Sequence, residues 1–310
     1  MLNDFDTNRD IALKIIHNQL NIKPIEITRF PTGYCHSVYY IKAKSDEYVL
    51  RITSKENKRF YDGSIKWLNE LAQFEIPIPK ILGHGQSNNV YYALITYING
   101  KDICDVYHTL NNSQKYEIVK EIVEIQRKVS TLSPVKINGS EDYSPAACMK
   151  DIEGFIQRSR ENIMANKVFD PAVCDDVESL LGMFENYLAN VKPVVFLDDI
   201  STKNVLIRNG KLVGIVDIDE MGYGDPLAVV GLMNMALLAM DADTKYIDYW
   251  LDEIHATAIQ RKAVTFYTLL SCIDFMGERG MKFDNGKVVP VDQKEVELFN
   301  SIYRVLLSRF

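Results

Sequence analysis

The 310-residue sequence has an ordinary globular composition, with 47% hydrophobic and 25% charged residues. This length can hold one large domain or two lobes with an ample core. A net charge of −7 and a pI near 5.4 argue against a nucleic-acid backbone as partner and mildly favour a cationic ligand.

Cysteine usage and the apolar stretches indicate a cytoplasmic protein with no membrane partner. The 5 cysteines are scattered and form no C-x-x-C pair, which favours reduced thiols over a disulfide frame or a zinc site. The opening "MLNDFDTNRD" is acidic and polar, unlike a secretory signal. The most apolar stretch, "LAVVGLMNMALLAM" at 227–240, is too short to span a bilayer and predicts a buried core helix.

The N-terminal part of the chain is predicted to be rich in β-strands. Residues 8–20 show helical spacing, and the strand-like runs "IEITRF", "SVYYIKAK" and "EYVLRIT" follow, the last two joined by a tight turn at Ser45-Asp46. A helix is predicted at about 57–73. The apolar positions expected to share one face of it are Ile65, Leu68, Leu71 and Ala72. The prolines of "IPIPKIL" require an extended segment next, and "NVYYALITYI" predicts a further strand ending at Asn99-Gly100.

The remainder of the chain is predicted to be helical, interrupted only by one hairpin. Helical periodicity is found at about 116–132, 147–163, 171–190, 226–240, 257–275 and 292–308. The expected fold class is therefore α+β and bilobal, with a β-rich lobe at 1–98 and a helical lobe at 99–310. A short connection at 97–101 would leave a cleft between the two lobes.

The stretch "VVFLDDISTKNVLIRNGKLVGIVDIDE" at 194–220 gathers polar side chains around two apolar runs. Asn209-Gly210 suits the positive φ angles of a type I′ turn, so "NVLIR" and "KLVGIV" predict a β-hairpin. Pairing back from this turn brings Asn204 and Asp217 to the open end of the hairpin, and Asp199 enters that end from the preceding loop. Three oxygen-bearing side chains are expected to converge there.

The spacing of Asp199 and Asn204, D-x-x-x-x-N, carries little information alone, since roughly one such pair is expected by chance at average usage. The apolar strand before Asp199, the hairpin after Asn204 and the further carboxylate of Asp217 add the context. Kinases that transfer a phosphoryl group use two oxygen ligands to hold Mg²⁺ and a further carboxylate to accept the proton of the acceptor hydroxyl. The alternative is structural: Asp199 would cap a turn and Asn204 would bond locally.

The whole chain resembles the aminoglycoside phosphotransferase-type small-molecule kinases, which have a protein-kinase-like fold. The family's catalytic loop, H-G-D-x-x-x-x-N, falls on 197–204, and its metal segment falls on "VDIDEMGYGDP", where Asp225-Pro226 is the closing pair. The resemblance implies that Asp199 is the catalytic base and that Asn204 and Asp217 bind Mg²⁺.

The same resemblance assigns the nucleotide contacts to the N-terminal lobe. "FPTGYCHSVYYI" is similar to the glycine-turn loop over the phosphates, with Gly33 at the turn. "EYVLRI" matches the strand whose base contacts the phosphates, here Arg51, and "LITYING" matches the hinge, whose backbone around Thr96 and Ile98 would receive the base. The implied donor is ATP or GTP.

Several positions depart from the family pattern. Leu197 stands where the loop His is expected, and Arg51 replaces a Lys, which keeps a cation with different geometry. The helix Glu that should pair with this cation has no clear counterpart. Ser64 or Ile65 occupies its place, and the nearest acids that could substitute are Asp62 and Glu70.

Four further residues have both a functional and a structural interpretation. His36 either faces the nucleotide or is an exposed loop residue. Asp219 and Glu220 could contact a second ion or a cationic substrate, although such charges are more often solvated. Lys203 could approach the transferring phosphoryl group or lie at the surface.

The sequence therefore predicts a Mg²⁺-dependent phosphotransferase that phosphorylates a hydroxyl of a small molecule, with an aminoglycoside or similar antibiotic as one candidate acceptor. A monomer or weak dimer with no nucleic-acid partner is expected. Two alternatives stay open: a catalytically weak nucleotide-binding regulatory relative, and a metabolic kinase acting on choline, homoserine or a sugar. No motif fixes the acceptor pocket.

Overall fold

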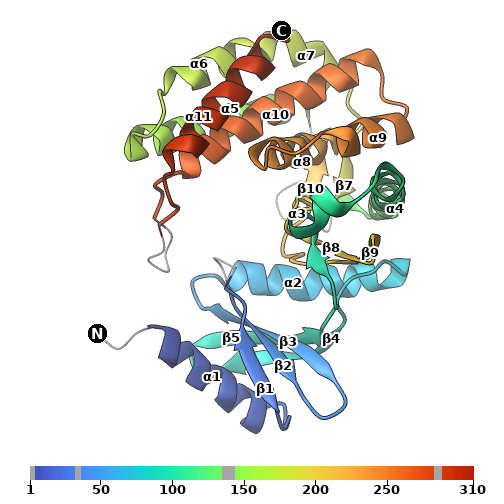
Figure 1. Ribbon diagram of the computed structural model, residues 1–310, viewed down its shortest axis with the longest axis vertical. Helices are drawn as coiled ribbons and strands as arrows, with labels where there is room; N and C mark the ends of the chain where they lie inside the picture. Colours follow the sequence, from blue (N-terminus) through green and yellow to red (C-terminus); the bar gives the residue numbers. More distant parts are fainter. Residues whose placement is uncertain (1–3, 32–35, 135–143, 283–287) are drawn as a thin grey trace. The chain divides into compact units, whose positions relative to one another are not determined.

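The computed structural model describes residues 4–31, 36–134, 144–282 and 288–310 (Figure 1). The chain divides into two compact units. One, here called the sheet unit, comprises residues 1–100 and 213–220; the other, the helical unit, comprises 101–212 and 221–310. The segment that contains Asp217 thus returns to the N-terminal unit. The expected α+β class, with an antiparallel N-terminal sheet and a mainly helical remainder, is confirmed.

The sheet unit is built on a five-stranded antiparallel sheet with the strand order β1-β2-β3-β5-β4. Its elements are α1 (Asp4–Asn18), β1 (Glu26–Arg29), β2 (His36–Lys42), β3 (Glu47–Ser54), α2 (Lys58–Leu71), the 3₁₀ turn η1 (Ala72–Phe74), β4 (Ile81–Ser87) and β5 (Val90–Thr96). The expected turn at Ser45-Asp46 joins β2 to β3, closed by the Ala43 N–H donating to the Asp46 carbonyl at 2.9 Å.

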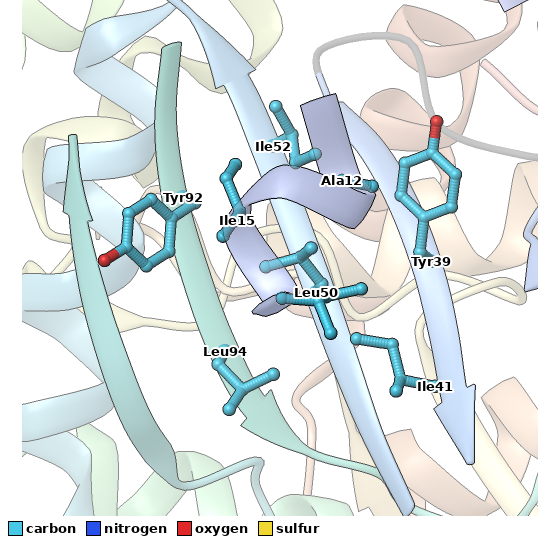
Figure 2. Close-up of a cluster of buried hydrophobic side chains, with 9 residues drawn as sticks. Ala12, Ile15, Tyr39, Ile41, Leu50, Ile52, Tyr92 and Leu94 are labelled. Atoms are coloured by element: carbon cyan, nitrogen blue, oxygen red, sulfur yellow. The ribbon is translucent and has the colours of Figure 1, made fainter. Parts of the chain in front are cut away.

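One face of this sheet packs against α1. Apolar side chains of α1 and of the three central strands form a buried cluster, most of whose members are labelled in Figure 2: Ala12, Ile15, Ile16, Tyr39, Ile41, Leu50, Ile52, Tyr92 and Leu94. Successive strand residues point to opposite faces of a sheet. Because Leu50 and Ile52 face α1, Arg51 between them points to the other face, where it meets α2.

The buried face of α2 is partly different from the expected one. Leu68 and Leu71 are buried as predicted, but the other buried positions are Ser64 and Trp67. Ile65 is only half-buried, and Ala72 is exposed because the α-helix ends at Leu71 and continues as a 3₁₀ turn. A polar residue lies on the buried face because it meets the Arg51 guanidinium, as described below.

The helical unit contains more strand structure than the predicted hairpin. Its elements are β6 (Lys101–Asp102), α3 (Ile103–Val106), η2 (Tyr107–Thr109), α4 (Asn112–Val129), α5 (Pro145–Asn166), α6 (Ala172–Ser179), α7 (Leu181–Ala189), β7 (Val194–Phe196), β8 (Val205–Arg208), β9 (Lys211–Ile215, whose last residues belong to the sheet unit), β10 (Gly222–Gly224), α8 (Leu227–Ala239), α9 (Lys245–Glu253), α10 (Ala258–Glu278) and α11 (Gln293–Leu307). The prediction that only one hairpin interrupts the helices of this part of the chain was therefore wrong. The prediction of one helix over 171–190 was also wrong, because the helix is broken at Leu180 into α6 and α7.

The hairpin itself is confirmed. Asn209 and Gly210 both have positive φ angles, of 54° and 73°, as a type I′ turn requires, and they join β8 to β9 in a sheet of order β6-β8-β9. The apolar stretch at 227–240 forms α8, most of whose side chains are buried. Among the residues that the structure describes, no helix is both long and apolar enough to cross a membrane.

Candidate functional site

The predicted site residues fall in both units. Asp217, Arg51, Thr96 and Ile98 belong to the sheet unit, and the loop from Asp199 to Asn204 belongs to the helical unit. Gly33 lies outside the described residues. The two groups are described one after the other.

Asp217 is held in the left-handed region of backbone space, with φ of 61°, an uncommon conformation for a residue other than Gly, Asn or Asp. The chain before it is fixed by the Ile215 N–H, which donates to the Pro77 carbonyl at 2.8 Å. The Asp217 side chain is 50% exposed, and its Oδ1 accepts a hydrogen bond from Arg51 Nη2 at 2.8 Å. A carboxylate that is anchored on one side and open on the other can bind a cation.

Arg51 is only 6% exposed and uses its guanidinium fork on several acceptors. Nη1 donates to Ser64 Oγ of α2 at 3.1 Å, and Nη2 donates to Asp219 Oδ2 at 2.7 Å as well as to Asp217. Ser64 thus occupies the expected position of the helix Glu, but it is neutral. Asp62, one of the suggested substitutes, pairs with Lys58 on the exposed side of α2 at 2.5–2.7 Å.

Asp219 and His36 extend this network. His36 is the first residue of β2 and is buried, so the exposed-loop interpretation was wrong. Its Nδ1 lies 2.8 Å from Thr53 Oγ1, and its Nε2 lies 2.6 Å from Asp219 Oδ2. Burial raises the pKa of the Asp219 carboxyl, but the Arg51 charge and the His36 contact outweigh it and lower the pKa to about 2. Asp219 is therefore an anion at neutral pH.

The network places potential metal ligands close together. One ligand atom from each of His36, Asp217 and Asp219 lies within 4.8 Å of the others. The second oxygen of Asp219, Oδ1, is buried and has no hydrogen-bond partner among the described residues. Glu220, the next acid along, is exposed instead and lies 4.0 Å from the exposed Arg59, which favours the solvated interpretation for this residue.

The proposed hinge is only partly available to a ligand. Thr96 ends β5, and its backbone N–H donates to the Lys80 carbonyl at 2.9 Å while its Oγ1 accepts from the Lys80 N–H. The Ile98 side chain packs close to Gly214, where a Cβ would lie 2.8 Å from Ile98 Cδ1. Because the Thr96 N–H is already bonded, the backbone of Ile98 is the better candidate to receive a base.

In the helical unit, the loop 197–204 follows the short strand β7. The Asp199 side chain is exposed, whereas Asn204 is 9% exposed, and Asn204 Nδ2 donates to the Asp199 carbonyl at 2.8 Å. The local bond that the structural alternative expected is thus present. It uses only the amide nitrogen, so Asn204 Oδ1 remains suited to a metal because an amide oxygen has lone pairs and no proton.

The first residue of this loop, Leu197, is hydrogen-bonded to α4. Leu197, at the position of the family's His, is buried; its N–H donates to Gln126 Oε1 at 3.0 Å and its carbonyl accepts from Gln126 Nε2 at 2.9 Å. No sequence signal pointed to Gln126, since a Gln on an amphipathic helix is usually a surface residue. In the structure it fixes the backbone from which Asp199 projects.

Asp225 fixes the C-terminal end of the segment "VDIDEMGYGDP". Its Oδ2 accepts from the hydroxyls of Tyr187 (2.6 Å) and Tyr267 (3.0 Å), and its Oδ1 accepts from the Leu227 N–H at the start of α8. Burial raises the pKa of this carboxyl, against the effect of these donors. The strand β10 just before it pairs antiparallel with β7. The Asp-Pro pair therefore has a structural role here.

Lys203 is exposed and lies near two half-buried carboxylates, those of Asp102 and Glu278. Burial raises the pKa of Asp102 to about 6, and the positive charge of Lys203 counteracts part of that effect. Lys203 also acts on Glu278, whose pKa is raised chiefly by burial. Lys203 thus interacts electrostatically with two acids of the helical unit.

Comparison with known proteins identifies the family. The model of a phosphotransferase enzyme family (APH) matches residues 26–261. The chain belongs to this phosphotransferase family. The match spans Arg51, the 197–204 loop and the Asp217 segment, so the resemblance inferred from the motifs is confirmed at the level of the family.

Solved structures agree on the fold. APH(2")-IIia, in complex with GDP and kanamycin, has a TM-score of 0.71 at 13% identity, covering 97% of this chain and 99% of that chain. A thermostable mutant of aminoglycoside phosphotransferase APH(4)-Ia, in complex with ADP and hygromycin B, has a TM-score of 0.65 at 14% identity, covering 95% and 97%. A protein-kinase-like fold of the aminoglycoside phosphotransferase type is thereby confirmed.

A curated relative covers a smaller part. Over 96 residues the chain is 28% identical to a Staphylococcus aureus protein described as an uncharacterized protein in the ileS 3′ region. The matched region is 30% of this chain and 73% of that protein.

Proposed function

We propose that this family member transfers a phosphoryl group from ATP or GTP, with Mg²⁺, to a hydroxyl of a small molecule. The observation that carries the proposal is the state of the 197–204 loop: Asp199 presents an exposed carboxylate while Asn204 and Gln126 fix the loop beneath it. An exposed acid on a fixed loop is what a base acting on a diffusing acceptor requires.

Asp199 orients the acceptor hydroxyl and takes its proton as the oxygen attacks. Asn204 Oδ1 and the open side of Asp217 are the oxygen ligands for Mg²⁺, and both are of the type that this ion prefers. Mg²⁺, when bound, neutralises charge that develops on the phosphoryl oxygens. Arg51 contacts the nucleotide phosphates, and the backbone near Ile98, rather than the bonded N–H of Thr96, receives the base. Gly33 is assigned to the loop over the phosphates by the family resemblance alone.

Aminoglycosides are the first acceptor candidates because one similar structure is a complex with GDP and kanamycin and another is a complex with ADP and hygromycin B. Those structures share less than a fifth of their residues with this chain, so by themselves they indicate only a common fold. The proposal of an aminoglycoside acceptor therefore rests on membership of the phosphotransferase family. The excess of acidic residues over basic ones, 42 against 35, suits a cationic acceptor.

One observation favours a second candidate, a weakly active nucleotide-binding relative. The fork of Arg51 is engaged by two carboxylates, Asp217 and Asp219, at 2.8 and 2.7 Å. If the guanidinium stays paired with these acids, its electrostatic attraction to the nucleotide phosphates is weaker.

The deciding experiment is a screen of purified protein with ATP or GTP and Mg²⁺ against aminoglycosides, choline, homoserine and sugars. Mass spectrometry of the acceptors detects the addition of one phosphoryl group. A phosphorylated acceptor that disappears with Asp199→Asn supports the proposal. Saturable Mg²⁺-nucleotide binding with no phosphorylated product from any acceptor would favour the weakly active relative.

A further inference from the structure

A buried cation needs a counter-charge, and the source of that charge for Arg51 is unusual. Leaving a buried guanidinium unpaired is strongly destabilising, because the charge has lost its hydration and gains no partner in exchange. The polar residue that α2 offers to Arg51 is Ser64, whose hydroxyl carries no charge. The carboxylates come from the segment after β9, that is, from Asp217 and Asp219.

Of these two acids, Asp219 is the better placed to fix Arg51. Its side chain is 12% exposed, against 50% for Asp217, so its attraction to Arg51 is less screened by water. The same oxygen, Oδ2, contacts both Arg51 Nη2 (2.7 Å) and His36 Nε2 (2.6 Å). His36 is itself fixed by Thr53 on β3. The contacts of Asp219 thus lead to two neighbouring strands, β2 and β3.

The backbone supports the same geometry. At Gly63, one residue before Ser64 on α2, a Cβ would lie only 1.9 Å from the Asp219 carbonyl oxygen. A side chain at this position would push the segment away from α2, and glycine permits the close approach. The Ser64 hydroxyl and the Asp219 carboxylate can therefore both reach the Arg51 guanidinium.

We propose that Asp219 is the positioning residue of Arg51. It supplies, from the segment that carries Asp217, the negative charge that would otherwise have to come from a carboxylate on α2. Asp217 is then left with an open oxygen for Mg²⁺, while Asp219 and His36 aim the guanidinium at the nucleotide phosphates. This inference rests on the proposed function, because it assigns a partner to the phosphate-contacting residue of that function.

The test measures the affinity of each variant for Mg²⁺-ATP and Mg²⁺-GTP by calorimetry, and KM and kcat with an acceptor from the screen. Asp219→Asn keeps the shape and removes the charge, and it should raise the nucleotide Kd and KM about tenfold with a smaller change in kcat, as loss of an orienting partner does. The matched control is Glu220→Gln, which removes an exposed carboxylate one residue later and should change neither constant.

Two combinations separate positioning from a purely structural role. In Asp219→Asn/Ser64→Asp the charge returns from the α2 side, and nucleotide affinity should recover by at least half of the logarithmic loss. In an Arg51→Met background, Asp219→Asn should have no further effect on the nucleotide Kd, since the group that it positions is gone. A tenfold loss in that background, or an Asp219→Asn variant with wild-type affinity, would overturn the proposal.

If Asp219→Asn does not fold, His36→Gln decides, because it keeps the Asp219 charge and removes the imidazole contact. A weaker nucleotide affinity in this variant supports the proposal, and an unchanged affinity contradicts it. Failure of the proposed function is distinguishable: the wild-type protein would then form no phosphorylated acceptor, whereas failure of this proposal is seen only in the nucleotide Kd of the variants relative to that of the wild type.

Discussion

The Arg51 guanidinium pairs with two carboxylates of the segment after β9 and is also proposed to contact the nucleotide phosphates. A guanidinium presents five donors in a rigid plane, and this one contacts a hydroxyl through Nη1 and two carboxylates through Nη2, whereas an ammonium would have to reach all three acceptors from one nitrogen. The departure from the Lys of the family pattern is thus accompanied by a second departure, Ser64, and by an acid at 219. The three positions are best understood together.

Substitution of Arg51 tests its role directly. Arg51→Lys should keep part of the activity because a cation remains, although it loses the fork geometry, whereas Arg51→Met should lose most of the activity and weaken nucleotide binding. Steady-state kinetics and calorimetry check this. A folded Arg51→Met protein with wild-type affinity and rate would make Arg51 a packing residue, and the phosphate-binding cation would have to be sought at Lys42 or Lys44.

Asp217 and Asn204 are each proposed as a ligand for Mg²⁺. Asp217→Ala should raise the Mg²⁺ concentration needed for half-maximal nucleotide binding, and Asn204→Ala should do so more mildly, because an amide is a weaker ligand than a carboxylate. Titration of Mg²⁺ at fixed nucleotide measures the effect. An unchanged Mg²⁺ dependence in both variants would contradict the assignment of Asp217 and Asn204 as metal ligands and would favour a structural role for both.

Asp102 should make stability depend on pH. Burial raises its pKa from the ordinary 3.8 to about 6. An acid whose pKa is higher in the folded protein binds its proton more readily when folded, so the free energy of unfolding should fall as pH rises from about 4 through 6. Asp102→Asn should therefore be more stable than the wild type by about 1 kcal/mol at pH 7, after allowance for screening, and similar to it at pH 4. Urea denaturation at the two pH values measures both differences, and equal stability at pH 7 would contradict the assignment.

At the scale of elements, patterns with a clear period predicted the structure well. The alternation in "EYVLRIT" gives β3, and the Asn209-Gly210 dipeptide gives the turn between β8 and β9. Strands of two or three residues are too short to show a period, so β6 and β10 were missed, whereas β7 was expected as the apolar strand before Asp199. The break between α6 and α7 falls at Leu180, a good helix former, and no Pro or Gly at that residue signals it.

The candidate site was predictable only where a local motif exists. The D-x-x-x-x-N spacing and the Asp217 segment can be recognised in the sequence, and the family match covers both. The contacts of Asp219 with Arg51 and His36 join residues more than 160 positions apart, and they depend on how β2, β3, α2 and the segment after β9 pack. A polar residue on the buried face of α2 was unexpected for the same reason.

The helix α4 is expected to control the catalytic loop through Gln126. Gln126→Met fills a similar volume but leaves the N–H and carbonyl of Leu197 without these partners, at a cost of about 1–3 kcal/mol. Turnover should fall about tenfold or more because Asp199 is misplaced, while nucleotide affinity is kept. The control is Gln157→Met on α5, where the side chain bonds to Glu161 at the surface. Equal losses of turnover in the two variants would contradict a specific role for α4.

At the scale of the whole molecule, each compact unit has its own part of the proposed chemistry. The sheet unit holds Arg51, Asp217 and Asp219 in one network that includes the segment 213–220. The helical unit holds Asp199 on a loop fixed by Asn204 and Gln126. Substitutions of Arg51 and Asp219 should therefore act chiefly on nucleotide binding, and substitutions of Asp199 and Gln126 chiefly on acceptor activation.

The most direct test of this account uses Asp199→Asn, with phosphoryl transfer and nucleotide affinity measured on the same preparation. A general base that also positions the acceptor contributes about 10²–10⁴-fold, so the rate of product formation should fall by that factor. The Kd for Mg²⁺-nucleotide should stay within about twofold of the wild type, because the carboxylate acts on the acceptor and not on the phosphates. A variant that keeps most of the wild-type turnover with a good acceptor would contradict the account.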